Sequence, residues 1–245
     1  MSVTGVVAAL DFEARSLGKR NDSTMVSVSG IGADNAARAA RSLAAGGATA
    51  LLSWGVAGAL DPALCCGTAV LPGEVLERGR QFQTDPLWRE GVASALQGRV
   101  ALHSGALYTS EVAVAAAAHK ARLFQHTGAV AVDMESAAIA AVAAELALPF
   151  LVLRVILDTA HDSLPDSVLR SFQAPASAGS ATSPAGTSPA GASAAAPRIW
   201  PLLCAPGDWG GLLRLALRYR TAGRALGACR RLAGPTLMAA ARIDS

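Results

Sequence analysis

Four acidic residues stand where the sequence predicts strand ends or helix starts. Glu13 follows one apolar segment, Asp158 ends another, and Asp133 and Glu135 lie together at the start of a predicted helix. Carboxyl groups in such places can transfer protons and can stabilise positive charge. Asp133 has a simpler interpretation, because an acidic residue in the first turn of a helix favours the helix dipole. Glu13, Glu135 and Asp158 are therefore the candidates for chemistry.

Short apolar segments alternating with helical patterns must position these acids. The predicted strands are residues 3–10, 24–28, 50–54, 129–132 and 150–156. The predicted helices cover 35–45, with Asp34 as the cap, and 134–146. Strands that are apolar on both faces and alternate with helices indicate a largely parallel or mixed sheet covered on both sides. Ligands of such sheets gather at the carboxyl ends of the strands, where these acids lie.

The composition indicates an ordinary α/β enzyme rather than a membrane or metal protein. The 245 residues are 52% apolar, enough for one large domain. No apolar run approaches the roughly 20 residues that span a bilayer, so a cytoplasmic location is expected. Four cysteines and four histidines lack metal-ligand spacing, and Ser-Gly-Ile-Gly at 29–32 lacks the third glycine of a dinucleotide site. Neither a metal nor a cofactor is predicted.

The C-terminal part differs in composition from the rest. Residues 1–172 are assigned to the catalytic domain, and residues 173–197, nearly all small residues and proline, predict a disordered insertion. Residues 198–245 carry eight arginines against two aspartates and predict a basic amphipathic helix from 209 to 232. Packing of this helix on the domain is favoured, with peripheral contact to an anionic membrane as the alternative. No aromatic residues interleave with the arginines in the manner of a base-stacking surface, which disfavours nucleic acid.

Five segments resemble, in the same order, the purine nucleoside phosphorylase and methylthioadenosine nucleosidase superfamily. They are Ala-Ala-Leu-Asp-Phe-Glu-Ala (8–14), Ser-Gly-Ile-Gly (29–32), Ser-Trp-Gly-Val-Ala-Gly-Ala-Leu (53–60), Ala-Val-Asp-Met-Glu-Ser-Ala-Ala (131–138) and Leu-Pro-Phe-Leu-Val-Leu-Arg-Val-Ile-Leu-Asp (148–158). The resemblance implies a three-layer nucleoside phosphorylase-like fold, with a mixed central β-sheet flanked by helices. It also implies cleavage of the N-glycosidic bond of a purine nucleoside, and homo-oligomers are common in this superfamily.

Within the superfamily, the chain is most similar to the hopanoid-associated phosphorylase group. The shared features are Gly-Val-Ala-Gly at 55–58 and an arginine-rich C-terminal extension. This resemblance implies phosphorolysis of a lipid-linked adenine nucleoside, an adenosylated hopanoid, with phosphate as co-substrate. The enzyme would then reach its substrate at the inner membrane face. Hydrolysis of 5′-substituted adenosines by a nucleosidase is the alternative.

The resemblance also assigns roles to residues that bind the nucleoside. Asp158 matches the acid that gives a proton to purine N7, and burial would raise its pKa toward neutrality. Glu135 matches the residue that accepts hydrogen bonds from the ribose hydroxyls. Met134 matches the residue that packs under the sugar, although a methionine here is equally explained as core. Tyr108 falls near the aromatic residue that stacks on the base.

A second group of matched residues concerns the nucleophile. Arg154 and Gly55 align with the phosphate or nucleophile site, although Arg154 could equally pair with Glu135. Glu13 aligns with the glutamate that activates water and would repel a phosphate dianion. Val56 replaces a serine that contacts the nucleophile in many relatives. Phosphate is the favoured nucleophile because the group resemblance covers more of the sequence than these two positions, and water is the alternative. A hypothesis from another functional class is a non-catalytic nucleoside-binding or membrane-associated accessory protein.

Overall fold

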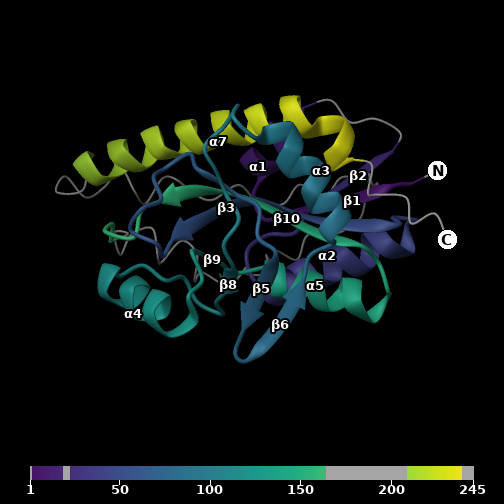
Figure 1. Cartoon of the computed structure of the whole chain (residues 1–245), viewed down its shortest axis with the longest axis horizontal. Coiled ribbons are helices and arrows are strands. Elements are labelled where there is room, and N and C mark those ends of the chain that lie inside the picture. Colours follow the sequence, from purple (N-terminus) through teal and green to yellow (C-terminus); the bar gives the residue numbers. More distant parts are fainter. Residues whose placement is uncertain (1, 19–22, 164–208, 239–245) are drawn as a thin grey trace, which may run out of the picture.

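A mixed β-sheet with helices on both faces organises the protein (Figure 1). The structure is a computed structural model, and it describes residues 2–18, 23–163 and 209–238. The strands are β1 (Thr4–Ala8), β2 (Thr24–Val28), β3 (Ala50–Ala59), β4 (Ala69–Val70), β5 (Glu74–Glu77), β6 (Arg80–Gln83), β7 (Leu102–His103), β8 (Leu107–Thr109), β9 (Ala131–Asp133) and β10 (Phe150–Asp158). The helices are α1 (Asp11–Ser16), α2 (Ala33–Ala45), α3 (Pro86–Leu96), α4 (Ala117–Thr127), α5 (Ser136–Glu145) and α7 (Trp209–Leu237).

The long strands β3 and β10 form the centre of the sheet. They run parallel to each other, and β1 runs parallel to β3 on its other edge. In contrast, β9 is antiparallel to β3 and β4 is antiparallel to β10. The predicted mixed sheet is therefore confirmed. The pairing sets Arg154 opposite Gly55 and Asp158 opposite Gly58, which brings two sequence motifs together.

Two layers of helices cover the sheet. On one face α2 packs against α5, and on the other α7 packs along α3, α1 and β10 (Figure 1). Apolar side chains of α7 recur at helical spacing and are buried in the core; they are Ala222, Leu226, Cys229, Ala233 and Leu237. This helix therefore shares a core with the sheet, and its removal would expose that core to water. No helix in the described part of the chain is long and apolar enough to cross a membrane.

Two local expectations are wrong. The glycine segment at 55–58 was expected to follow a strand ending at Trp54, but β3 continues to Ala59 because it pairs with β10 along this length. Asp34 was expected to cap α2, but it lies inside the helix, which begins after Gly32. The predicted disordered insertion at 173–197 lies outside the described residues.

Candidate active site

A pocket opens at the carboxyl ends of β1, β3, β9 and β10. The pocket is open to solvent on one side, so a small ligand can enter it. Four carboxyl side chains line it, those of Glu13, Asp133, Glu135 and Asp158, and Met134 lies among them. The rest of the wall is largely apolar, formed by Ala9, Leu10, Ile31, Val56, Ala57, Val112, Val114, Val132 and Leu157. The structure thus brings together the three predicted acids and the predicted methionine.

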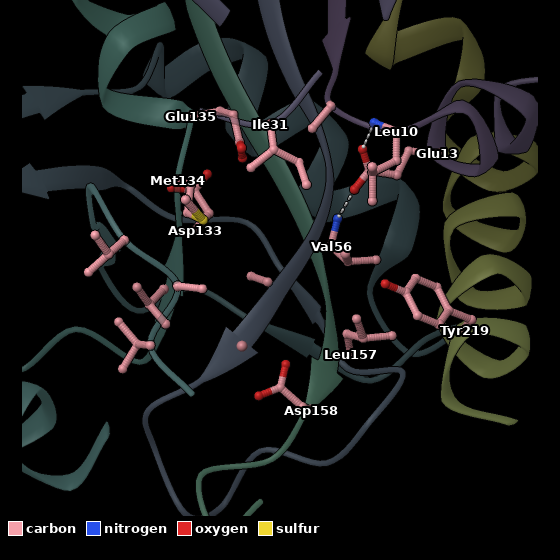
Figure 2. Close-up of a pocket in the computed structure, with 17 residues that line it drawn as sticks. Leu10, Glu13, Ile31, Val56, Asp133, Met134, Glu135, Leu157, Asp158 and Tyr219 are labelled. Carbon is pink, nitrogen blue, oxygen red and sulfur yellow. Dashed lines mark hydrogen bonds between the residues drawn. The ribbon is translucent and has the colours of Figure 1, made fainter. Parts of the chain in front are cut away.

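Glu13 is held at the pocket wall by backbone groups. It is the third residue of α1, and its Oε2 accepts a hydrogen bond of 2.9 Å from the N–H of Leu10, just before the helix. Its Oε1 accepts another of 2.9 Å from the N–H of Val56 on β3 (Figure 2). Burial raises the pKa of Glu13, although the nearby Arg154 opposes this rise. A carboxylate has about four lone-pair sites, so Glu13 can still accept a hydrogen bond from water.

Gly55 explains how Glu13 and Arg154 come so close to β3. A β-carbon at this position would stand closer than 3.0 Å to Oε1 of Glu13 and to Nη1 of Arg154, nearer than real β-carbons come to other atoms. Glycine is therefore required by the close approach of two charged side chains. The role of Gly55 at the nucleophile site stays a prediction. In the structure, the side chains nearest to it are those of Glu13 and Arg154.

Arg154 is fully buried and held by protein groups. Its Nη2 lies 2.6 Å from Oδ2 of Asp133 and 3.6 Å from Oε2 of Glu135. The same nitrogen donates to the hydroxyls of Ser53 at 2.9 Å and Ser136 at 3.2 Å. Arg154 does not line the pocket. Its shortest ion pair is therefore with Asp133, for which only a structural role at the start of a helix was predicted.

Glu135 stands at the opposite side of the same charge cluster. Its Oε1 accepts a hydrogen bond of 3.0 Å from the N–H of Gly32, whose φ of +104° suits glycine alone. Burial raises the pKa of Glu135 to about 7; Arg154 lowers it and Asp133 raises it. The loop after β2 thus helps to fix the carboxylate that the resemblance assigns to the ribose.

Asp158 ends β10 at the other end of the pocket from Glu135 (Figure 2). Lys120 of α4 donates to its Oδ2 and is completely buried. Burial raises the pKa of Asp158, and the ion pair with Lys120 opposes this rise. Burial was expected to raise this pKa, whereas the contact with Lys120 was not predicted. A lone lysine in an alanine-rich helix gives no sequence signal, since its partner lies 38 residues away.

Tyr219 of α7 also lines the pocket and was not predicted as a site residue. Its ring packs edge-on against Phe12, with the centroids 5.0 Å apart, and faces the pocket near Val56 and Leu157 (Figure 2). Burial raises its pKa to about 12, so the phenol stays protonated. Tyr108, the predicted stacking residue, lines a different hollow on the other side of Val112. The structure does not bring Tyr108 together with the other predicted residues.

Solved structures with the same fold include enzymes that act on nucleosides. Futalosine hydrolase of Helicobacter pylori aligns over 94% of this chain and 97% of its own, with a TM-score of 0.65 and 17% identity. The 5′-methylthioadenosine/S-adenosylhomocysteine nucleosidase of the same organism covers 65% of this chain and 86% of its own, with a TM-score of 0.60 and 20% identity. A putative methylthioadenosine nucleosidase of Weissella paramesenteroides covers 69% and 93%, with a TM-score of 0.59 and 23% identity.

These alignments show the nucleoside phosphorylase-like fold that the sequence predicted, and identities this low show the fold alone. No curated protein matches the sequence. The model of one family, described as the phosphorylase superfamily, matches residues 16–182. That match includes Met134, Glu135, Arg154 and Asp158 and spans more than half of the sequence. The chain therefore belongs to the phosphorylase superfamily.

Proposed function

We propose that this pocket cleaves the N-glycosidic bond of an adenine nucleoside and uses water as the nucleophile. The observation that carries the choice of water is the charge of the pocket wall. Four carboxyl groups line it, and the described residues that line it include no lysine or arginine. A phosphate dianion would meet these carboxyl groups without an exposed cation, whereas water and a developing sugar cation fit them.

The base end of the proposed site contains Asp158. When protonated, its carboxyl group donates the proton to purine N7, the O–H electron pair stays on Asp158, and the electrons of the C1′–N9 bond move into the purine ring. Burial favours the protonated acid that this step needs. An aspartate-to-asparagine variant of the Helicobacter pylori nucleosidase carries 5′-methylthioadenosine in its active site, which makes this nucleoside a suitable first probe.

The sugar end contains Glu135, Met134 and Glu13. Glu135 is proposed to accept hydrogen bonds from the ribose hydroxyls, and the thioether of Met134 to pack beneath the sugar. Glu13 is proposed to take a proton from the attacking water while the water oxygen bonds to C1′. Its raised pKa makes its carboxylate a stronger base than an exposed one.

The proposed function is tested by product analysis. Purified protein is incubated with adenosine and 5′-substituted adenosines, including an adenosylated hopanoid, in phosphate-free and phosphate buffers. Hydrolysis predicts adenine and the free sugar in both buffers, and Glu13→Gln should lose turnover. Phosphate-dependent release of a sugar 1-phosphate would replace hydrolysis by phosphorolysis. No release from any substrate would favour the accessory-protein alternative.

The lipid-linked substrate implied by the hopanoid-associated group is a finer proposal. It is supported by the outer face of α7, where Arg220, Arg224 and Arg231 are exposed and form no ion pair with a described residue, and where Leu217 is 52% exposed. Arginines on one helix face would attract the anionic headgroups of a membrane. We propose that this face brings the protein to the bilayer that holds its substrate.

Charge substitution tests the membrane proposal better than truncation, because α7 is part of the core. The variant R220Q/R224Q/R231Q should lose binding to anionic vesicles, and binding of the wild type should fall as salt rises. The control R38Q/R78Q/R99Q removes the same charge from exposed arginines elsewhere and should still bind. Equal loss in both variants, or binding that does not depend on salt, would contradict the proposal.

A further inference from the structure

Lys120 is an unusual residue for the position that it occupies. The sequence has lysine at two positions only, 19 and 120, and uses arginine for every other strong base. Lys120 is the fourth residue of α4, yet none of it is exposed. Burying an ammonium group is costly unless its charge is paired and its donors are satisfied. The partners of the Lys120 ammonium group must therefore offset the cost of its burial.

The ammonium group of Lys120 has a complete set of partners. It donates to Oδ2 of Asp158, to the backbone oxygen of Thr159 at 2.8 Å and to the backbone oxygen of Asp162 at 3.1 Å. An ammonium group has three donors, and all three are used. The two carbonyl groups would suffice to tie α4 to the loop after β10. The third bond goes to a carboxyl group that lines the pocket.

The same bond restricts how Asp158 can act. With Oδ2 bound to Lys120, Oδ1 receives no hydrogen bond from any described residue. The carboxyl group is thus anchored through one oxygen, and the other can face a ligand.

We propose that Lys120 is a positioning residue for the general acid, which anchors Oδ2 of Asp158 and stabilises the negative charge that Asp158 gains when its proton passes to the purine. The inference rests on the proposed function. In the step concerned, the O–H bond of Asp158 breaks and the N7–H bond forms. The electron pair left on the carboxylate lies beside the ammonium group, and Lys120 keeps its own protons.

Other charged and titratable groups also face Asp158 and must be considered. Asp162, on the loop after β10, is paired at 2.7 Å with Arg218 of α7, so these two charges largely offset each other. Tyr219 of α7 and Cys66, before β4, are neutral groups whose pKa values are raised by burial. Lys120 is therefore the cation with the largest effect on Asp158, and it lowers the pKa of this acid.

The test is the pH dependence of adenine release from 5′-methylthioadenosine by wild type, K120Q and K120R. A general acid must be protonated, so the rate falls as pH rises through its pKa. K120Q keeps amide donors and removes the charge, so this falling limb should move to higher pH by about one unit or more. The value of kcat should fall about tenfold or more, with a smaller change in KM. K120R keeps the charge and should leave the limb in place.

A double-mutant cycle supplies the second readout. In a D158N background, K120Q should cause little further loss of turnover, because the residue that it positions is already gone. The role of Lys120 would be overturned if K120Q left the falling limb of the pH–rate profile unmoved. It would also be overturned if K120Q reduced turnover in D158N by the same factor as in wild type. Either result would leave the proposed function intact. If K120Q does not fold, a limb that moves upward in K120R would overturn it. Absence of cleavage by folded wild type would remove both proposals.

Discussion

The two ends of the pocket carry similar acids in different electrostatic settings. At the sugar end, Glu13, Asp133 and Glu135 share a single buried guanidinium, that of Arg154. At the base end, Asp158 has Lys120 to itself, and the neighbouring Asp162 is paired with Arg218. The first end has more carboxyl groups than cations, and at the second end the two numbers are equal. Arg154, Lys120 and their carboxyl partners are buried, so these charges act with little screening by water.

The difference matches the charges that bond cleavage would create. Breaking the C1′–N9 bond makes the sugar more positive and the purine more negative. Excess carboxylate at the sugar end would stabilise the sugar cation. An acid beside a cation at the base end can give up its proton and remain stable as a carboxylate. The pocket is thus polarised in the direction in which the proposed reaction moves its electrons.

The largest expected effect comes from removing the acid at the base end. Asp158→Asn keeps the shape but has no proton to donate, so kcat should fall by roughly 10²- to 10⁴-fold. Nucleoside binding, measured by calorimetry, should persist. The matched control is Asp61→Asn, at a loop residue outside the pocket. Full activity of Asp158→Asn would remove the contrast between the two ends.

The next effect concerns the charge excess at the sugar end. The pKa of folded Glu135, about 7, lies above its ordinary value of 4.5, so the folded state binds the proton more tightly. This contribution to stability is complete below about pH 4.5 and is lost as pH rises through 7. Glutamine does not titrate, so Glu135→Gln does not lose stability in this way as pH rises. The free energy of unfolding of the variant minus that of wild type should therefore increase from pH 5 to pH 8, by up to about 3 kcal/mol.

Denaturant melts at each pH measure this difference. Glu145→Gln, which removes an exposed glutamate paired with Arg41, is the control and should show little dependence on pH. If Glu135→Gln behaved like this control, Glu135 would not be the buried acid with a raised pKa that is described above.

A smaller effect is expected from crowding the sugar end. Gly55→Ala places a β-carbon against Glu13 and Arg154, so it should destabilise the fold by about 1–3 kcal/mol and displace the base. The control is Gly223→Ala, in α7, where nothing lies within 4 Å of the added carbon. That change should be neutral or slightly stabilising. A Gly55→Ala protein as stable and active as wild type would show that this close approach is not needed.

The smallest effect compares Tyr219, which lines the pocket, with Tyr108, which lines the separate hollow. Tyr219→Leu keeps an apolar wall but loses the aromatic ring, and it should raise KM for the nucleoside several-fold, up to about tenfold. Tyr108→Leu, in the separate hollow, should leave KM unchanged. Steady-state kinetics on both variants decides between them. A rise in KM for Tyr108→Leu alone would restore the assignment made from the sequence.

Much of the sheet could be predicted because its central strands are long and apolar. β3 and β10 are buried along most of their lengths, and in the sequence they are nearly continuous apolar runs, interrupted by Ser53 and Arg154. The region between them was not predicted in detail. β4 and β7 have two residues each and β8 has three, too short for a periodic pattern to emerge.

The candidate site was predictable only where its residues lie in recognisable segments. Glu13, Glu135 and Asp158 stand at element ends within such segments, and the structure gathers them in one pocket. Tyr219 reaches that pocket from a distant helix, and Lys120 reaches Asp158 at its wall from another; only the fold brings them there. The ion pair of Arg154 with Asp133 likewise depends on strand pairing across the sheet. Partners set by tertiary packing leave no local pattern in one sequence.

The orientation of a bound nucleoside tests the central claim most directly. A crystal structure of the Asp158→Asn protein with 5′-methylthioadenosine should place N7 of the purine beside residue 158. The ribose hydroxyls should lie against Glu135, with C1′ open to a water molecule held by Glu13. A nucleoside bound in the reverse direction, with its base at Glu135 and its sugar at residue 158, would contradict the assignment of the two ends, as would binding outside this pocket.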